Sequence, residues 1–372
     1  MIYLDHAATS MHKPPQVYEA VLNAMRSCAS VGRSGHRAAL RAAETAFACR
    51  IAAGDLFEAE PEQVVFTFNA THGLNIAIRS LVRPGDRVVV SGFEHNAVMR
   101  PLYQMGAEIA VAGTRLFDQE NTLREFRKMV TPNTKAVICT HVSNVFGYVL
   151  PVTEIAALCW QRKVPFVLDA AQSAGVLPIS LKQLRAAFIA MPGHKGLLGP
   201  QGTGILLCGQ RPKPLLCGGT GSNSLAAEMP DFLPDMLEVG THNVPGIAGL
   251  YAGLMYLKEV GLSSVWSREN DLLLRMREEL KFLDNMKVFT GKGVDQTGVL
   301  SFQILDRDCE EVAQKLAEAD IAVRAGLHCA PLAHRSAGTL KQGTVRVSFS
   351  PENSPGDIDH LTQVLTQIVY EK

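Results

Sequence analysis

The sequence predicts an α/β protein, with a large domain on a mostly parallel sheet and a smaller α+β domain. Short apolar runs alternate with stretches of helical periodicity over the first two thirds of the chain. Several of these runs are apolar throughout, as strands buried on both faces of a parallel sheet are. The pattern of apolar runs and helical stretches changes after about residue 250, and a chain of 372 residues is too long for a single small core. We therefore expect a large domain over 15–254 and a small domain formed by 1–14 and 255–372.

The elements of the large domain begin with two helices, which apolar residues at helical spacing predict over 15–28 and 36–57. The strands follow as short apolar runs: Val64–Phe68, Arg87–Ser91, Ala136–His141, Pro165–Asp169, Ala187–Ala190 and Gly204–Cys208.

The second set of elements begins with a helical stretch at Gly246–Val260, which leads out of the large domain. A terminal helix with one apolar face closes the chain after Ser354-Pro355. Between them we expect one strand, a helix and then two more strands: Val299–Leu305, Cys309–Ala319 as the helix, Ile321–Arg324 and Thr344–Phe349.

Composition excludes several classes of function. The 36 basic residues balance 36 acidic ones, so nothing predicts a surface that binds nucleic acid. No apolar run reaches the roughly 18 residues of a membrane helix, and the N-terminus lacks the pattern of a secretory signal, so we expect a cytoplasmic protein. The eight cysteines include no CxxC pair, so we expect no metal site. Most have apolar neighbours and are expected to be buried, Cys329 excepted.

One lysine lies between a predicted strand and a glycine-rich turn, in Gly193-His194-Lys195-Gly196. Most lysines are solvated surface groups. The neighbours of Lys195 are glycine, leucine and proline rather than charged residues, which suits a lysine enclosed in a site. A desolvated lysine has a lowered pKa and can bond covalently to the carbonyl carbon of a cofactor. Lys195 is therefore the candidate anchor of such a cofactor.

A carboxylate ends one of the predicted strands. Asp169 lies where open α/β sheets place their ligands, and it could pair with the ring nitrogen of a pyridine cofactor. Gln172, three residues later, could bind a ring hydroxyl. Alternatively, Asp169 only caps the next helix, because Asp is a favoured N-cap. The residues alone leave both interpretations open.

A third stretch, Asn69-Ala70-Thr71, connects a strand to a helix expected to begin near Leu74. The free N–H groups of a helix N-terminus can bind a phosphate, and Thr71 would add a hydroxyl.

Taken together, these stretches resemble the pyridoxal-phosphate (PLP) enzymes of fold type I, and specifically the class V aminotransferase family, which includes cysteine desulfurases and selenocysteine lyases. The resemblance runs from residue 2 to about residue 368. Segments that resemble family motifs include Tyr3–Ser10, Glu94–Ala97, His141–Gly147, Gly240–Asn243 and Arg324–Pro331.

The resemblance implies a role for each matching residue. Catalysis would involve Lys195, the sulfur-accepting Cys329, and His95, which stacks on the cofactor ring and transfers protons. The substrate would contact Ala8, Asn144, Arg324 and Arg346, the last holding its carboxylate. PLP would bind through Ala70, Thr71, His95, Asn144, Asp169, Gln172, His194, Lys195 and, from the partner subunit of a homodimer, Thr241.

Two positions depart from the family pattern near the expected phosphate. Ala70-Thr71-His72 stands where the family has a Thr-Thr-Glu-like turn, and Pro192 stands where it has serine. His194 and Thr71 would then carry more of the phosphate binding.

Cys329 differs from the other cysteines because it lies in a loop-like segment beside His328 and near Arg324. Positive neighbours lower the pKa of a thiol and favour the nucleophilic thiolate. A buried, inert cysteine is the alternative interpretation. Arg346 could likewise be a structural ion-pair residue, although its planar fork suits a substrate carboxylate. We expect surface or structural roles for five histidines: His12, His36, His242, His334 and His360.

The implied activity converts L-cysteine to L-alanine and leaves the sulfur on Cys329 as a persulfide, for transfer to a protein or small-thiol acceptor. Iron–sulfur cluster assembly is the family's commonest use of such sulfur. Three alternatives remain open at this point. They are a selenocysteine lyase with the same residues, a PLP aminotransferase or β-lyase in which Cys329 is incidental, and a non-catalytic relative that carries sulfur passively.

Overall fold

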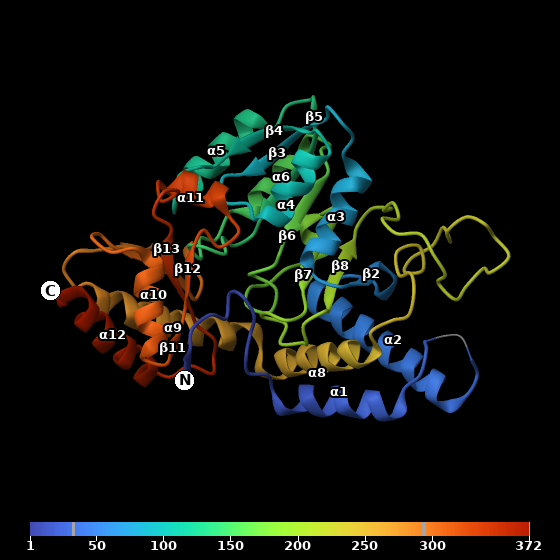
Figure 1. The fold of residues 1–372 in the computed structure, drawn as a ribbon. Helices are drawn as coiled ribbons and strands as arrows, with labels where there is room; N and C mark the ends of the chain where they lie inside the picture. Colours follow the sequence, from blue (N-terminus) through green and yellow to red (C-terminus); the bar gives the residue numbers. More distant parts are fainter. Residues whose placement is uncertain (32–33, 292–294, 372) are drawn as a thin grey trace.

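The structure is a computed structural model, and it describes residues 1–31, 34–291 and 295–371. Its largest element is a seven-stranded sheet in the order β2-β8-β7-β6-β5-β3-β4 (Figure 1). Strands β3 to β7 run parallel, whereas β8 runs antiparallel to both β7 and β2. The bounds are β2 (Val64–Thr67), β3 (Arg87–Ser91), β4 (Glu108–Ala112), β5 (Thr134–Thr140), β6 (Phe166–Asp169), β7 (Phe188–Pro192) and β8 (Gly204–Cys208).

Helices cover both faces of this sheet, because the central strands are apolar on both sides. On one face, α3 (Ala70–Leu81) and α4 (Asn96–Gln104) share a core with alternate residues of the strands. The other face packs against α2 (Arg37–Phe57), α5 (Gln119–Met129), α6 (Val152–Gln161), α7 (Leu181–Leu184) and α8 (Val244–Val260). Helix α1 (Pro15–Ser27) lies along α8 (Figure 1).

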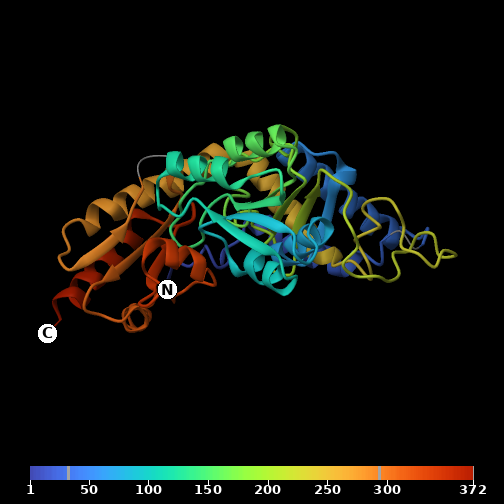
Figure 2. The same cartoon turned by 90° about the horizontal axis from the view of Figure 1, so that it is seen from above.

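The C-terminal part of the chain forms a separate layer, seen beside the large sheet in Figures 1 and 2. Its antiparallel sheet has the order β12-β13-β10-β9, and β1 pairs in parallel with β11. The strands are β1 (Ile2–Tyr3), β9 (Met286–Phe289), β10 (Val299–Ile304), β11 (Ile321–Ala322), β12 (Arg324–Gly326) and β13 (Thr344–Ser348). The helices are α9 (Leu262–Leu280), α10 (Cys309–Glu318), α11 (Pro331–Ala337) and α12 (Pro355–Tyr370).

A hydrophobic core of its own holds this second layer together. It joins the N-terminal Leu4 to residues of α9, β10, α10, β13 and α12. The first residues of the chain therefore pack with the last ones, which brings the segment after β1 between the two sheets. The domain bounds at 14 and 254 stay a prediction.

The parallel strands agree closely with the apolar runs of the sequence, whereas two expectations need correction and two strands were not expected. The helix expected near Leu74 begins at Ala70, because the Asn69 side chain accepts a hydrogen bond from the His72 N–H (2.9 Å) and caps it there. The single strand expected over Ile321–Arg324 is two strands, which pair in different sheets. The edge strands β4 and β9 were not expected, since both are only partly buried.

One edge of the large sheet collects the segments of interest. Strands β2, β3, β5, β6 and β7 all run in the same direction, so their carboxyl ends meet along this edge. Such an edge is where open α/β sheets bind ligands. At the far side of the molecule, the segment 209–243 between β8 and α8 projects away from the sheet in both views (Figures 1 and 2). Within the described residues, the structure contains no helix with the length and hydropathy to span a membrane.

Candidate active site

A pocket at the carboxyl edge of the sheet brings together eight of the predicted site residues. They come from the carboxyl ends of five strands and the segments that follow them, and they share a cavity of about 510 Å³, which includes space open to solvent. They are Ala70, Thr71, His95, Asn144, Asp169, Gln172, His194 and Lys195, and Pro192 lines the pocket beside them. Ala8, Thr241, Arg324, Cys329 and Arg346 do not line this cavity.

Lys195 lies at the centre of this set, in the turn after β7. Burial lowers the pKa of its ammonium to about 8, and the nearby charge of Arg346 acts in the same direction. Asp169 opposes this shift only in part. A lysine with such a pKa is partly deprotonated near neutral pH, so its amine can act as a nucleophile or a base.

Asp169, the last residue of β6, lines the pocket and is almost inaccessible to solvent. Burial raises the pKa of its carboxyl, while the Ala171 N–H donates to Oδ1 (2.9 Å). Within the described residues no other hydrogen bond reaches this carboxylate, so Oδ2 is left for a ligand. The alternative role as a helix cap is excluded, because the next helix, α7, begins only at Leu181.

His95 also lines this pocket, from the turn after β3. The Ala97 N–H donates to His95 Nδ1 (3.0 Å), so the neutral ring carries its proton on Nε2. Burial and the charge of Lys195 lower the pKa of His95 to about 4, which keeps the ring neutral at physiological pH.

Glu94, the neighbour of His95, is a buried residue that the sequence analysis did not single out. Its Oε1 accepts hydrogen bonds from Ser91 Oγ (2.5 Å) and the Thr140 N–H (2.8 Å), so it ties the ends of β3 and β5 together. Burial raises the pKa of Glu94 to about 8. A glutamate before a histidine gives no sign of this role in the sequence.

The N-terminus of α3 faces the same pocket. The first N–H groups of a helix have no acceptor within it, and those of Ala70 and Thr71 lie beside the pocket. His72 does not line the pocket and stacks instead on Phe68, with ring centroids 4.6 Å apart. On the other side, His194 Nδ1 lies 2.9 Å from Thr9 Oγ1. These are the groups available to an anion.

Gln172 and Ala8 differ from their expected roles in detail. The Gln172 Nε2 donates to the backbone oxygen of Ala7 (3.0 Å), so this nitrogen fastens the N-terminal segment to the pocket. The Ala8 N–H closes a turn with the Asp5 oxygen (3.0 Å). Thr241 is exposed and lines a different hollow, together with His72 and His242.

Two arginines face each other beside the pocket. Arg324 of β12 and Arg346 of β13 are direct partners in the antiparallel register. Like charges opposite each other repel unless an anion lies between or beside them. Asp5 supplies one negative charge, because its Oδ1 lies 2.5 Å from Arg346 Nη2. The second positive charge remains available for an anionic ligand such as a carboxylate.

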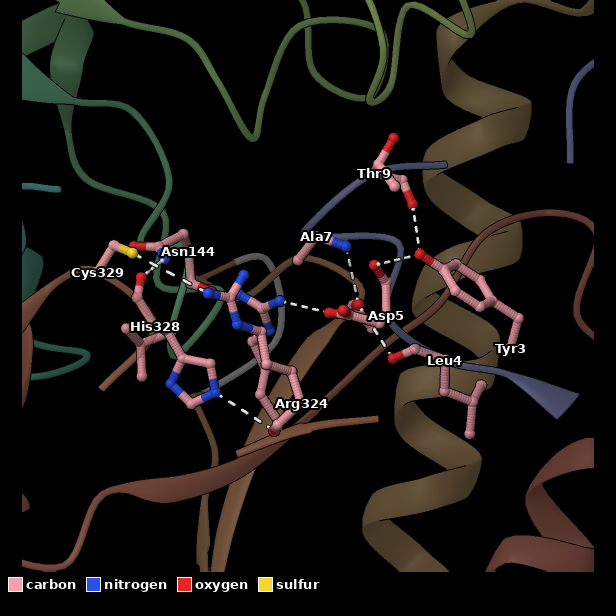
Figure 3. Close-up of polar contacts among 12 residues, drawn as sticks. Tyr3, Leu4, Asp5, Ala7, Thr9, Asn144, Arg324, His328 and Cys329 are labelled. Carbon is pink, nitrogen blue, oxygen red and sulfur yellow. Dashed lines mark hydrogen bonds and ion pairs between the residues drawn. The ribbon is translucent and has the colours of Figure 1, made fainter. Parts of the chain in front are cut away.

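Asn144 connects the arginines, the pocket and the cysteine loop, which is the segment 327–330 between β12 and α11. Its backbone oxygen accepts from Arg346 Nη1 (2.9 Å), and its Nδ2 donates to the backbone oxygen of His328 (2.8 Å). Figure 3 shows Asn144 beside Cys329, with Arg324 and Asp5 in the same group of polar contacts. Cys329 is exposed, and its Sγ lies 4.0 Å from Arg324 Nη2.

The environment of Cys329 corrects one expectation. His328 is buried and its pKa is lowered to about 2, mainly by burial, so it is neutral and is not a positive neighbour of the thiol. Arg324 is the cation that remains close. Among the other cysteines, Cys28 is half-buried and Cys217 is exposed, whereas the rest are buried as expected: Cys49, Cys139, Cys159, Cys208 and Cys309.

These residues fit PLP. The free oxygen of Asp169 suits a protonated pyridine nitrogen, Lys195 suits the aldehyde carbon, and the start of α3 suits the phosphate. Within the described residues, no cluster of three or more His, Cys, Asp or Glu side chains is placed to hold a metal ion.

Comparison with known proteins gives consistent matches. The family model described as Aminotransferase class-V matches residues 2–361. The chain is 32% identical to a probable cysteine desulfurase of Pyrococcus abyssi, over 99% of this chain and 94% of that protein. It is 30% identical to a cysteine desulfurase of Haloferax volcanii, over 98% and 88% of the two chains. The apo structure of a cysteine desulfurase from Thermococcus onnurineus superposes with a TM-score of 0.91 at 30% identity, covering 99% and 94%.

Proposed function

The chain belongs to the class V aminotransferase family, and we propose that it is a PLP-dependent cysteine desulfurase that takes the sulfur of L-cysteine onto Cys329. The observation that carries this proposal is the position of Asn144. Through its two hydrogen bonds, this residue ties the cofactor pocket to the arginine pair and to the loop that presents the thiol. The thiol of Cys329 lies beside the arginine pair, which can bind a carboxylate, and this pair lies next to the pocket of Lys195. This arrangement suits the removal of sulfur from an amino acid.

The cofactor pocket supplies the first part of the reaction. When bound, PLP provides an electron sink for carbanion chemistry at the substrate's α-carbon. Asp169 would hold the ring nitrogen, and the N–H groups at the start of α3 with His194 would hold the phosphate. With a pKa of about 8, Lys195 Nζ can anchor the cofactor and afterwards carry the α-proton of the substrate.

The arginine pair and the thiol supply the second part. Arg346, already oriented by Asp5 and Asn144, would bind the substrate carboxylate together with Arg324. The Cys329 thiolate then forms a bond with the substrate sulfur, and the bond from that sulfur to the β-carbon breaks. The electron pair of the broken bond stays with carbon, which takes up protons and leaves as alanine. Cys329 is left as a persulfide, which a thiol acceptor discharges.

A homodimer forms part of the proposal. Thr241 is exposed and does not line the pocket of Lys195 in its own chain. Its neighbour His242 is held by Glu238, at 2.6 Å, so the segment is anchored within the subunit next to the exposed Thr241. We propose that Thr241 completes the phosphate site of a second copy.

The test compares the wild type with Cys329→Ser, and with Cys217→Ser as the control, because Cys217 is also exposed. Each protein is incubated with L-cysteine and, separately, with L-selenocysteine, and alanine is measured. We expect wild type and the control to release alanine from L-cysteine and to carry one extra sulfur atom on the Cys329 peptide. Cys329→Ser should retain the cofactor absorbance but release no alanine from L-cysteine, since a serine hydroxyl is a poor nucleophile toward sulfur. Undiminished sulfur release by Cys329→Ser would make the chain a β-lyase instead.

A further inference from the structure

Three side chains behind the cysteine loop form a connected chain of polar contacts. His328 Nε2 lies 3.3 Å from the backbone oxygen of Arg324, and His328 Nδ1 lies 3.4 Å from His334 Nε2. His334 Nδ1 in turn lies 2.8 Å from Thr339 Oγ1. His334 and Thr339 are 0% and 1% exposed, so solvent does not satisfy these groups.

The protons of this chain can be assigned from its fixed end. A carbonyl oxygen only accepts, so the bond to the Arg324 oxygen requires a proton on His328 Nε2. A neutral His328 then has an acceptor at Nδ1, which requires His334 to donate from Nε2. His334 Nδ1 is left as an acceptor and accepts a hydrogen bond from the Thr339 hydroxyl. Burial lowers the pKa of His334 to about 4, which agrees with two neutral rings.

The loop in front of this chain has an unfavourable backbone. His328 and Cys329 both have positive φ angles, of 48° and 56°. Residues other than glycine rarely adopt this left-handed region. The backbone is held by Asn144 at the His328 oxygen and by the Asn96 N–H at the Cys329 oxygen (2.8 Å). These two contacts hold the backbone oxygens of the loop. The imidazole of His328 holds the loop a second time, through its contact with the backbone oxygen of Arg324 in β12.

We infer that His328, His334 and Thr339 are positioning residues for sulfur transfer. Their directed hydrogen bonds hold Cys329 in the left-handed conformation that keeps its thiol beside Arg324. The inference rests on the proposed role of Cys329. His334 belongs to α11 and does not line the cofactor pocket, so its loss leaves PLP binding in place.

The experiment compares His334→Leu with His334→Gln. Leucine cannot donate to His328 Nδ1, whereas the glutamine amide places an N–H donor near the position of His334 Nε2. The first measurement is the rate of iodoacetamide alkylation of the Cys329 peptide at one fixed pH, read by mass spectrometry to separate it from exposed Cys217. The second is the pair kcat and KM for L-cysteine. PLP absorbance and thermal unfolding check that each variant is folded.

We expect His334→Leu to change the alkylation rate of Cys329, because the thiol is no longer held in its position beside Arg324. Its kcat should fall roughly three- to tenfold, the factor that one intramolecular hydrogen bond is worth, with KM little changed. His334→Gln should restore both readouts to within about twofold. Thr339→Val should give an intermediate effect, and it replaces His334→Leu in the comparison if the leucine variant does not fold.

A folded His334→Leu variant with the wild-type alkylation rate and kcat would overturn the inference, and so would a glutamine variant as impaired as the leucine one. The proposed function fails separately. If Cys329→Ser keeps full desulfurase activity, the role of Cys329 is wrong. If Cys329→Ser is inactive and His334→Leu is normal, only the positioning role is wrong.

Discussion

Arg346 and Asp5 lie 341 residues apart in the sequence and form an ion pair of 2.5 Å beside the candidate active site. Arg346 is 1% exposed, so its charge depends on this partner and on the backbone oxygen of Asn144. The two interpretations that the sequence left open for Arg346 are therefore compatible. The ion pair with Asp5 holds the Arg346 guanidinium in place. Arg324, which lies opposite Arg346 on the neighbouring strand, adds the positive charge that an incoming carboxylate would neutralise.

Asp5→Asn should lower the free energy of unfolding by about 3 kcal/mol, because it leaves a buried guanidinium without its counter-ion. A ligand carboxylate would replace the missing charge. We therefore expect L-alanine, a product with the same carboxylate, to raise the melting temperature more in Asp5→Asn than in wild type, measured by thermal unfolding with bound PLP. Asp320→Asn is the control, since Asp320 forms an exposed ion pair with the N-terminus. Equal shifts in both variants would argue against a carboxylate at Arg346.

The strands of the large sheet could be predicted because each is a local pattern. The run at Arg87–Ser91 has the bounds of β3 as expected, since a strand buried on both faces needs only apolar neighbours in sequence. The edge strand β4 could not be found in this way, because a partly buried edge leaves a weaker apolar signal. Ile321–Arg324 was wrong as one strand, because its two ends find hydrogen-bond partners in different sheets, which no local pattern encodes.

The residues of the candidate site divide in the same way, into those with a local signal in the sequence and those without one. Lys195 and Asp169 could be identified because each follows a recognisable strand and has distinctive neighbours. The pairing of Asp5 with Arg346, and of His328 with His334, depends on how the small sheet packs, so sequence reasoning missed both. The misjudged charge of His328 has the same origin, since only burial reveals that this ring stays neutral.

Asp169→Asn should leave the fold intact and reduce turnover by a factor on the order of 10² or more, because an amide cannot stabilise a protonated ring nitrogen as an anion does. Borohydride should still attach PLP to the Lys195 peptide in this variant, which separates cofactor attachment from turnover. Glu94→Gln is the matched control, because Glu94 is also a buried carboxylic acid. With a pKa of about 8, Glu94 is already largely protonated near neutral pH. Its replacement by a neutral glutamine should therefore leave turnover nearly unchanged. Wild-type turnover in Asp169→Asn would rule out Asp169 as the ring partner.

Glu269 gives a prediction for the pH dependence of stability. Its side chain is 9% exposed, and burial raises the pKa of the carboxyl from 4.5 to about 8. Between these values the folded state binds the proton more tightly than the unfolded state, so its contribution to stability is lost as pH rises from about 4.5 to 8. Glu269→Gln resembles the protonated form.

Urea unfolding of wild type and Glu269→Gln should therefore agree at pH 4.5 and diverge toward pH 8, with the variant more stable by a few kcal/mol at the upper end. Exposed Glu259→Gln is the control and should follow wild type throughout. Curves for wild type and Glu269→Gln that run parallel over this range would show that Glu269 is ionised in the folded protein.

The proposed exchange of Thr241 between subunits can be tested with mixed dimers of Lys195→Ala and Thr241→Val. Each variant carries a different affinity tag, so the mixed species can be isolated. If Thr241 serves the partner's site, one site of the mixed dimer has both Lys195 and a threonine, and the other has neither. The mixed dimer should then show about half of the wild-type activity per dimer, and one site with normal PLP retention.

If Thr241 instead served its own chain, the mixed dimer would pair a site without Lys195 with a site without the threonine. Its activity could not exceed half that of the Thr241→Val homodimer, and no site would retain PLP as wild type does. The exposed position of Thr241, outside the pocket of Lys195 in its own subunit, favours the first outcome. Light scattering provides the independent check, because a fully active monomer would remove the need for any residue from a partner.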